Sequence, residues 1–374
     1  MPVPHSPEHV PQAASGPARH AGLSPTRAVL PNGMVVIAKE TRKTPAVTLN
    51  LAVRAGALCD PADACGAMHL LSKVIDRGTA SRTADDIADA LESRGASLAT
   101  AINRHTLSMF CTCLTEDFDA VLDIIGDLVV NPIFPGAEVR TRQGEVVTAI
   151  AQDEDSPYVT ALLRLLALLY GASHPYGRPL KGTAENVLRL TRDRLLALHG
   201  ERFAPSVTSL VIVGDLSPAR AVDAAARVFG DWNAPPPPSV PLDPPPVAAA
   251  RRRLVVPMMN KAQADIAYGF TTIERSDPAY YAVSLMNNVL GQYALGGRLG
   301  DSIREQQGMA YYVSSAFEAN PIAGPLLIRA GVAPGNVDRA IASIDEELRR
   351  IRADGVTARE LDESRQYLVG AMPR

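Results

Sequence analysis

Three polar side chains that could do chemistry lie within one helical turn of each other: His69, Ser72 and Lys73, in a helix expected within Gly66–Thr79. An imidazole can bind a metal, but catalytic zinc needs three protein ligands, and one neutral imidazole does not supply them. The ammonium of Lys73, one turn from His69, would also repel a dication. The hydroxyl of Ser72 is too weak a base near neutral pH to activate water.

Simpler roles are open for these residues. His69 can be a structural histidine, hydrogen-bonded inside a cleft. Lys73 can pack its stem along apolar surface and keep its head in water. The remaining alternative is functional, with Lys73 pairing with a peptide carboxylate or carbonyl.

A second pair of donors follows much later in the chain, Arg304 and Tyr311, seven residues apart. Arginine offers a fixed cationic fork of N–H donors, and tyrosine offers a neutral hydroxyl. The plainer alternative is an arginine bonded to local carbonyls and a tyrosine packed in the core.

Composition excludes several classes of protein. The 374 residues carry a net charge of −3, so no overall basic field exists to hold nucleic acid or an anionic membrane. Four cysteines are too few for a disulfide scaffold. No secretory signal is visible, and the apolar run Ala161–Tyr170 contains Arg164 and is too short to cross a bilayer. We therefore expect a cytoplasmic protein.

The elements that must position these residues occur twice. Val47–Val53 and Ala264–Phe270 alternate as strands, and Asp60-Pro61 and Asp277-Pro278 are each expected to open a helix. A strand pair and a periodic helix follow each time: Gly95–Leu114 with Phe118–Val130, and Gly308–Ala330 with Val337–Ile351. The repeat predicts an α+β fold of two duplicated domains, each a largely antiparallel sheet with helices packed on one face.

Proline marks the boundary between the copies. Eight of the twelve residues in 235–246 are proline, which favours a stiff, extended spacer. After the final expected helix, Leu361–Gly370, the second copy has no counterpart of 186–215, so we expect a fragment or an incomplete domain. The predicted organisation is a disordered arm (1–25), a first domain (26–234), a Pro-rich linker (235–250) and a second domain (251–374).

The helix around His69 resembles the zinc-binding helix of the insulinase/pitrilysin/mitochondrial-processing-peptidase family. In that family the helix carries H-x-x-E-H, in which two histidines bind zinc and the glutamate polarises water. A further glutamate on a later helix completes the ligands. Other stretches resemble the family in the same order along the chain: Leu30–Gly33, His174–Gly177, Gly182-Thr183, Lys261–Ala264 and Arg304–Tyr311.

The departures from that pattern affect most of its working positions. His69 matches the first ligand, but Ser72 replaces the glutamate base and Lys73 the second histidine. Alignment of the later helix puts Ala149 at the third ligand position. Glu145 lies one turn earlier, about 6 Å along the helix, too far for a zinc–oxygen bond of about 2 Å. We therefore expect no catalytic residue and no metal at this chain's own site, only the vestigial positions His69, Lys73 and Ala149.

The resemblance implies half of a clamshell, with zinc held by a partner. Arg304 and Tyr311 match a family pair that binds substrate and stabilises the oxyanion across the cavity. We expect a non-catalytic, substrate-binding subunit of a heterodimeric zinc metallopeptidase, inactive alone. Its partners would be a homologous two-domain zinc-bearing subunit and an unfolded peptide, with no nucleic acid and no membrane.

Two other functions are open. One is a structural or scaffold pseudopeptidase subunit of a larger complex, in which Arg304 and Tyr311 have no catalytic consequence. The other is an active zinc endopeptidase with unusual ligands, which would have to bypass Ser72, Lys73 and Ala149.

Overall fold

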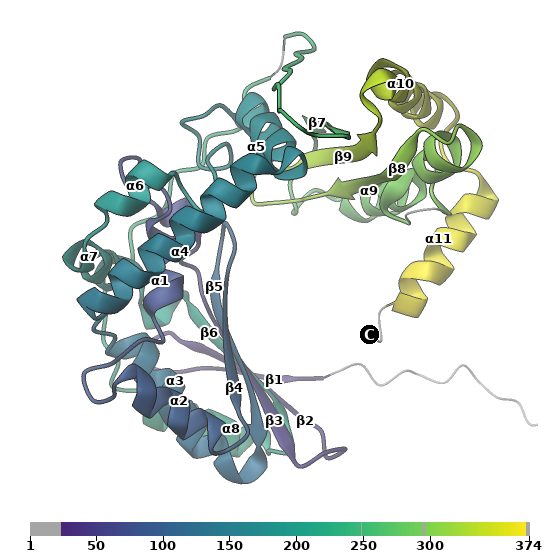
Figure 1. Cartoon of the computed structure of the whole chain (residues 1–374). Helices are drawn as coiled ribbons and strands as arrows, with labels where there is room; N and C mark the ends of the chain where they lie inside the picture. The colour runs from purple at the N-terminus through teal and green to yellow at the C-terminus, as the bar shows by residue number, and fades with distance from the viewer. Residues whose placement is uncertain (1–23, 248, 294–295, 372–374) are drawn as a thin grey trace, which may run out of the picture.

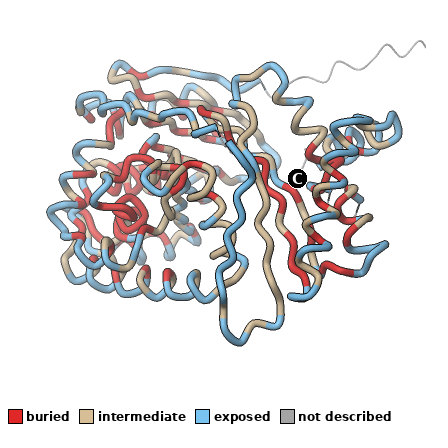
Figure 2. Tube along the Cα trace, turned by 90° about the horizontal axis from the view of Figure 1, so that it is seen from above, coloured by how far each residue is buried: buried red, intermediate tan, exposed pale blue. Residues whose placement is uncertain are grey.

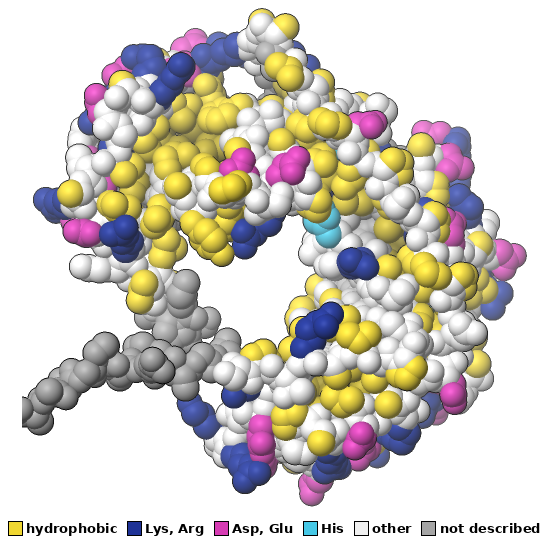
Figure 3. All heavy atoms as spheres, turned by 180° about the vertical axis from the view of Figure 1, so that it is seen from behind, with side chains coloured by type: hydrophobic (Ala, Val, Ile, Leu, Met, Phe, Trp, Pro, Cys, Tyr) yellow, Lys and Arg dark blue, Asp and Glu magenta, His cyan; other side chains and the backbone are white. Residues whose placement is uncertain are grey.

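The computed structural model describes residues 24–247, 249–293 and 296–371. The arm expected over 1–25 lies outside this range except for its last two residues. The chain forms two α+β bodies that curve around a central opening (Figures 1 and 3). Basic side chains are among those at the rim of that opening (Figure 3).

The first body contains one mixed sheet and eight α-helices among the described residues. Its strands are β1 (Thr26–Val29), β2 (Val35–Glu40), β3 (Ala46–Val53), β4 (Ser97–Ile102), β5 (Leu107–Leu114) and β6 (Thr208–Gly214). Its helices are α1 (Ala67–Val74), α2 (Ala84–Glu92), α3 (Phe118–Val130), α4 (Gly136–Asp155), α5 (Pro157–Tyr170), α6 (Ala184–Arg189), α7 (Arg192–Arg202) and α8 (Pro218–Phe229).

The first sheet has the strand order β1-β2-β6-β3-β5-β4, and all neighbours are antiparallel except β2 and β6. Alternate residues of β3, such as Leu49 and Leu51, are fully buried in the core. On the other face, Thr48 and Thr112 pair across β3 and β5, and their exposed hydroxyls share a 3.0 Å hydrogen bond. Helices α2, α3 and α8 lie outside the sheet, away from the opening (Figure 1). The predicted one-sided packing therefore describes this sheet.

The second body repeats part of this plan. Its elements are β7 (Ala264–Thr271), α9 (Tyr280–Asn287), π-helical turns η4 (Asn288–Gln292) and η6 (Gly300–Gln306), β8 (Ala310–Phe317), β9 (Pro325–Val332), α10 (Val337–Asp354) and α11 (Ala358–Ala371). The order β7-β9-β8 reproduces β3-β5-β4 of the first sheet. The α+β duplication inferred from the sequence is confirmed, and Figure 2 shows buried segments in both halves.

Helix α5 joins the two bodies. It lies against β7, where a Cβ on Gly269 would be 3.2 Å from Leu165 Cδ2. Arg329 of β9 donates to the carbonyl of Tyr158 at 2.8 Å and stacks on its ring. The second sheet is therefore covered on both faces over β7, which one-sided packing did not predict. Glycine allows this because it leaves room for the helix.

The Pro-rich linker is docked on the first body rather than free. Residues 232–258 contain no helix or strand where they are described, as the prolines predict. Val240 packs against a cluster that includes Leu58 and Tyr176. The carbonyl of Pro238 accepts a 2.9 Å hydrogen bond from Arg202. The segment is therefore held as a strap across the surface.

Within the described residues, no helix combines the length and apolar character needed to cross a bilayer.

Candidate functional site

Helix α1 carries the first candidate residues, and Asp60 fixes where it begins. The sequence suggests a helix opening directly after Asp60, but α1 starts at Ala67. The Asp60 carboxylate instead reaches over the intervening loop and accepts hydrogen bonds from the N–H groups of Gly66 and Met68, both at 2.7 Å. It satisfies donors that the first helical turn leaves without partners.

Burial of this carboxylate has an electrostatic cost. Asp60 is 5% exposed, and burial raises its pKa to about 6 against the opposing effect of the two N–H donors. Gly66 has a φ of +94°, and a Cβ there would lie 2.4 Å from the carbonyl oxygen of Lys181. The start of α1 is thus clamped between Asp60 and the loop around Lys181.

His69 lies on the buried side of α1. It is 9% exposed, and its Nδ1 is buried without a hydrogen-bond partner in the part of the chain that the structure describes. Burial lowers the pKa of His69 to about 4, with further lowering from the charges of Lys73 and Lys181. The ring is therefore neutral at physiological pH.

Ser72 and Lys73 point to different surroundings. Ser72 is buried, and its Oγ donates to the carbonyl oxygen of His69 at 2.7 Å, so the hydroxyl is used within its own helix. Lys73 is exposed one turn after His69, on the same side of α1.

Helix α4 packs against α1 and supplies the later positions. Ala149 is half-buried, and Glu145 is exposed and forms an ion pair with Arg142 on the same helix. One turn beyond Ala149, Asp153 forms a 2.7 Å ion pair with Lys181. This pair is not evident from the sequence. Helical spacing from Ala149 could have pointed to Asp153, whereas no local pattern places Lys181 opposite it.

The side chains around His69 do not fit a catalytic zinc ion. Ser72 is bonded to its own helix, Ala149 carries only a methyl group, and Asp153 is neutralised by Lys181. Across residues 24–247, 249–293 and 296–371, no group of three or more His, Cys, Asp or Glu side chains could hold a metal. Catalytic zinc takes three protein ligands, so one histidine is insufficient.

An open sheet edge lies beside α1. Strand β4 is the last strand of the first sheet, and α1 packs against it. An edge strand presents backbone N–H and C=O groups to which an extended peptide can add.

Arg304 and Tyr311 lie in the second body, at the end of η6 and the start of β8. The turn between them closes with Gly308 N–H donating to the Arg304 carbonyl at 3.0 Å. Tyr311 is the extra residue of a β-bulge between Ala310 and Tyr312, and it is 80% exposed. Bulges of this kind redirect side chains and are frequent beside functional sites.

The two donors have few partners of their own. Arg304 approaches Glu305 at 3.6 Å, and Tyr311 has no hydrogen bond to any residue that the structure describes. Tyr311 therefore does not pack in the core.

The predicted site residues fall into two groups. One turn holds Arg304 and Tyr311 near each other. The packed helices α1 and α4 carry the others: His69, Ser72, Lys73 and Ala149. Among the residues that the structure describes, no hydrogen bond joins these two groups; α1 and α4 belong to the first body and β8 to the second (Figure 1).

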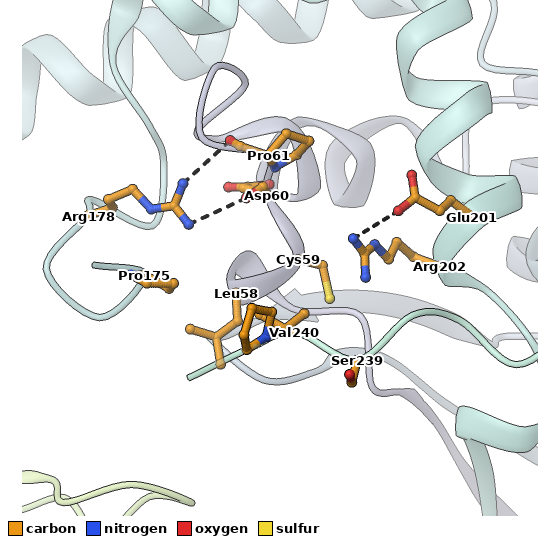
Figure 4. Close-up of a pocket in the computed structure, with 11 residues that line it drawn as sticks. Leu58, Cys59, Asp60, Pro61, Pro175, Arg178, Glu201, Arg202, Ser239 and Val240 are labelled. Carbon is orange, nitrogen blue, oxygen red and sulfur yellow. Dashed lines mark hydrogen bonds and ion pairs between the residues drawn. The ribbon is translucent and has the colours of Figure 1, made fainter. Parts of the chain in front are cut away.

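A separate cavity of about 370 Å³ lies behind Asp60, between the first body and the linker (Figure 4). Arg178 donates to the carbonyls of Asp60 and Pro61 at 3.4 Å, and Arg202 pairs with Glu201 at 2.9 Å. Its charged groups are thus engaged in holding the loop before α1 and the chain around it. His69, Ser72 and Lys73 do not line this cavity.

Two family models match successive parts of the chain. A model described as insulinase, peptidase family M16, matches residues 35–184, which include His69. A model described as peptidase M16 inactive domain matches residues 189–368, which include Arg304 and Tyr311.

Similar proteins of known sequence are described as zinc proteases. One from Mycobacterium leprae is 28% identical over 349 residues, 92% of this chain and 76% of that protein. One from Bacillus subtilis is 23% identical over 341 residues, 91% of this chain and 82% of that protein.

Solved structures share the fold. A peptidase M16 inactive domain from Pseudomonas fluorescens superposes with a TM-score of 0.86 at 25% identity, covering 93% of this chain and 84% of that one. A protease from Helicobacter pylori also gives 0.86, at 15% identity and with the same coverage. The periplasmic protease PqqL from Escherichia coli gives 0.78 at 18% identity, covering 93% of this chain and 38% of that one.

Proposed function

The chain belongs to the insulinase family of peptidases, family M16, and we propose that it is the non-catalytic, substrate-binding subunit of a heterodimeric zinc peptidase. One observation carries this proposal. Of the four family positions for zinc binding and water activation, only His69 keeps its residue type, while Ser72, Lys73 and Ala149 occupy the others. A chain with this donor set binds no catalytic zinc and cleaves no peptide by itself.

The proposed contribution of this subunit is Arg304 and Tyr311. Both are exposed, and Tyr311, the extra residue of a bulge, forms no hydrogen bond with any described residue. Directed at a peptide carbonyl held by a homologous zinc-bearing partner, they would donate hydrogen bonds to the oxygen as negative charge develops on it. Removing one such donor typically costs about 3–4 kcal/mol of transition-state stabilisation.

The proposed substrate is an unfolded peptide. The free edge of β4 offers main-chain hydrogen bonds that do not depend on the sequence of the peptide. A flexible segment can adopt the extended conformation that this pairing needs, so the site would favour unfolded peptides.

The test mixes the purified chain with the zinc-bearing M16 homologue from the same organism. We expect no stoichiometric zinc and no peptide cleavage from this chain alone, and higher activity from the mixture. Arg304→Ala and Tyr311→Phe should each lower the kcat of the pair by about 100–1,000-fold without weakening assembly. Arg349→Ala and Tyr281→Phe, at exposed positions of α10 and α9, are matched controls.

Two results would decide against the proposal. Stoichiometric zinc together with peptidase activity in the lone chain would identify an independent enzyme with unusual ligands. An Arg304→Ala/Tyr311→Phe double variant with unchanged activity in the assembled pair would favour a scaffold subunit instead.

The proposed location is the cytoplasm. The similar E. coli protein PqqL is periplasmic, so the location needs its own measurement. Fractionation of cells producing the full-length protein should recover it with cytoplasmic markers.

A further inference from the structure

We propose that the surface of α1 around His69 and Lys73 binds a carboxylate of the peptide substrate. This inference rests on the proposed function, because it names the chemical group that the peptide presents to the first body. The group can be a C-terminal carboxylate or an Asp or Glu side chain. Both present the same charged oxygens to a lysine.

The first supporting observation is the unsatisfied imidazole of His69. The residue is 9% exposed, and Nδ1 is buried with no hydrogen-bond partner among the described residues. Nε2 also forms no hydrogen bond with the described residues, but unlike Nδ1 it is not fully buried, so it is the ring nitrogen that keeps access to solvent. In the tautomer with its proton on Nε2, the neutral ring presents one N–H donor. A carboxylate oxygen is an acceptor that this donor suits.

The second observation concerns the ion pairs around Lys73. The carboxylates near it pair with other cations: Glu145 shares Arg142 with Glu138, and Asp76 pairs with Arg77 at 3.1 Å. The other nearby cation, Lys181, is neutralised by Asp153 at 2.7 Å.

Lys73 itself forms no ion pair with any residue in the described part of the chain. Its exposed ammonium therefore keeps its hydrogen-bond donors for a carboxylate, one turn from the His69 donor.

The third observation is the position of α1 beside the edge strand β4. An extended peptide that adds to β4 would run past α1, within range of a flexible lysine side chain. Lys73 stands where the family has a metal ligand. With a lysine at this position, the surface would bind an anion rather than a metal cation.

The experiment measures binding of a fluorescein-labelled, flexible decapeptide of Ala, Ser and Val to the full chain by fluorescence anisotropy. The peptide is compared in three forms: with a free C-terminal carboxylate, with an amidated C-terminus, and amidated with one internal Glu. We expect the amidated, Glu-free form to bind about tenfold or more weakly than at least one acidic form. Whichever acidic form binds more tightly identifies the source of the carboxylate.

Variants of Lys73 assign the effect to this position. Lys73→Met keeps a long apolar stem and should remove the advantage of the acidic peptides, whereas Lys73→Arg should retain most of it. Lys43→Met, at an exposed loop position, is the matched control and should bind as the wild type does. Circular dichroism confirms that each variant is folded.

The proposal is overturned if the folded wild type does not distinguish acidic from neutral peptides, or if Lys73→Met keeps the full preference. Failure of this carboxylate proposal can be distinguished from failure of the proposed function. Stimulation of a zinc-bearing partner that depends on Arg304 would survive a negative result at Lys73, and a carboxylate preference would survive the absence of any stimulation.

Discussion

The start of α1 and the start of β8 use their polar residues in opposite ways. Around α1, Asp60 and Ser72 are buried and bond to nearby backbone groups. At β8, Tyr311 is 80% exposed and has no partner among the described residues. The difference indicates that Asp60 and Ser72 maintain the local structure of α1, whereas Tyr311 is available to another molecule.

The two bodies also differ in how they are stabilised. The first sheet has six strands over a large core, and the second has three strands of the same order over a smaller one. In the first body a buried carboxylate, Asp60, has a raised pKa, whereas in the second Glu360 is paired with Arg298 and has a pKa lowered to about 2. The bodies should therefore respond differently to core truncation and to pH.

Truncating each core should give the largest effect. Phe118→Ala in the first core should cost about 3–5 kcal/mol, and Ile328→Ala in the second about 2–5 kcal/mol. The single tryptophan, Trp232, packs beside Phe229 in the first body, so its fluorescence reports unfolding there. In urea titrations we expect Phe118→Ala to shift the Trp232 transition more than Ile328→Ala does.

The control for these truncations is Val213→Ala on β6, where the side chain is 39% exposed. It should change stability by less than about 0.5 kcal/mol. Equal shifts of the Trp232 signal for both core variants would mean that the two bodies unfold as one unit.

The clamp at α1 should tolerate no side chain at Gly66. Gly66→Ala combines a positive φ with a contact of 2.4 Å to the Lys181 carbonyl, so we expect a loss of roughly 2–4 kcal/mol. Gly144→Ala on α4, where the space is open, should instead stabilise the protein by roughly 0.5–1 kcal/mol. Thermal melts compare the two, and a harmless Gly66→Ala would contradict the tight approach.

Removing the carboxylate of Asp60 should destabilise the first body by roughly 1–3 kcal/mol, because two buried N–H groups lose their acceptor. The variant should also change the response to pH. The folded pKa of about 6 lies above the unfolded value of 3.8, so the native state binds the extra proton between these values. The stability that Asp60 contributes is therefore largest below about pH 4 and is lost as pH rises through 6.

Urea titrations at pH 4.5 and pH 7 test this sign. Wild-type stability should fall more steeply with rising pH than that of Asp60→Ala. Equal slopes in the two proteins would show that Asp60 does not titrate in this range.

Glu360 should show the opposite sign and the smallest effect. Arg298 lowers the pKa of Glu360 from 4.5 to about 2. The stability that the Glu360 carboxylate contributes is therefore present above about pH 4.5 and is lost as pH falls toward 2. Because the pair is partly exposed, Glu360→Gln should cost below about 1 kcal/mol at pH 7. Adding 1 M salt should reduce that difference, and an undiminished difference would point to packing rather than charge.

The sequence by itself determined the repeating elements and predicted a degenerate zinc motif. The period-2 pattern of β3 and β7 and the helical period of α3 and α10 are local properties, so they can be read from neighbouring residues. The substitutions at Ser72 and Lys73 are equally visible, because helical spacing alone puts them beside His69.

Only the tertiary structure decided how these elements are held. Asp60 reaches past six residues to cap α1, Lys181 meets Asp153 from a distant loop, and α5 packs on β7 of the other body. The exposure of Tyr311 likewise depends on a bulge whose register is set by β9. These contacts join residues far apart in the chain, and their energies depend on burial and approach distance, which no local pattern encodes.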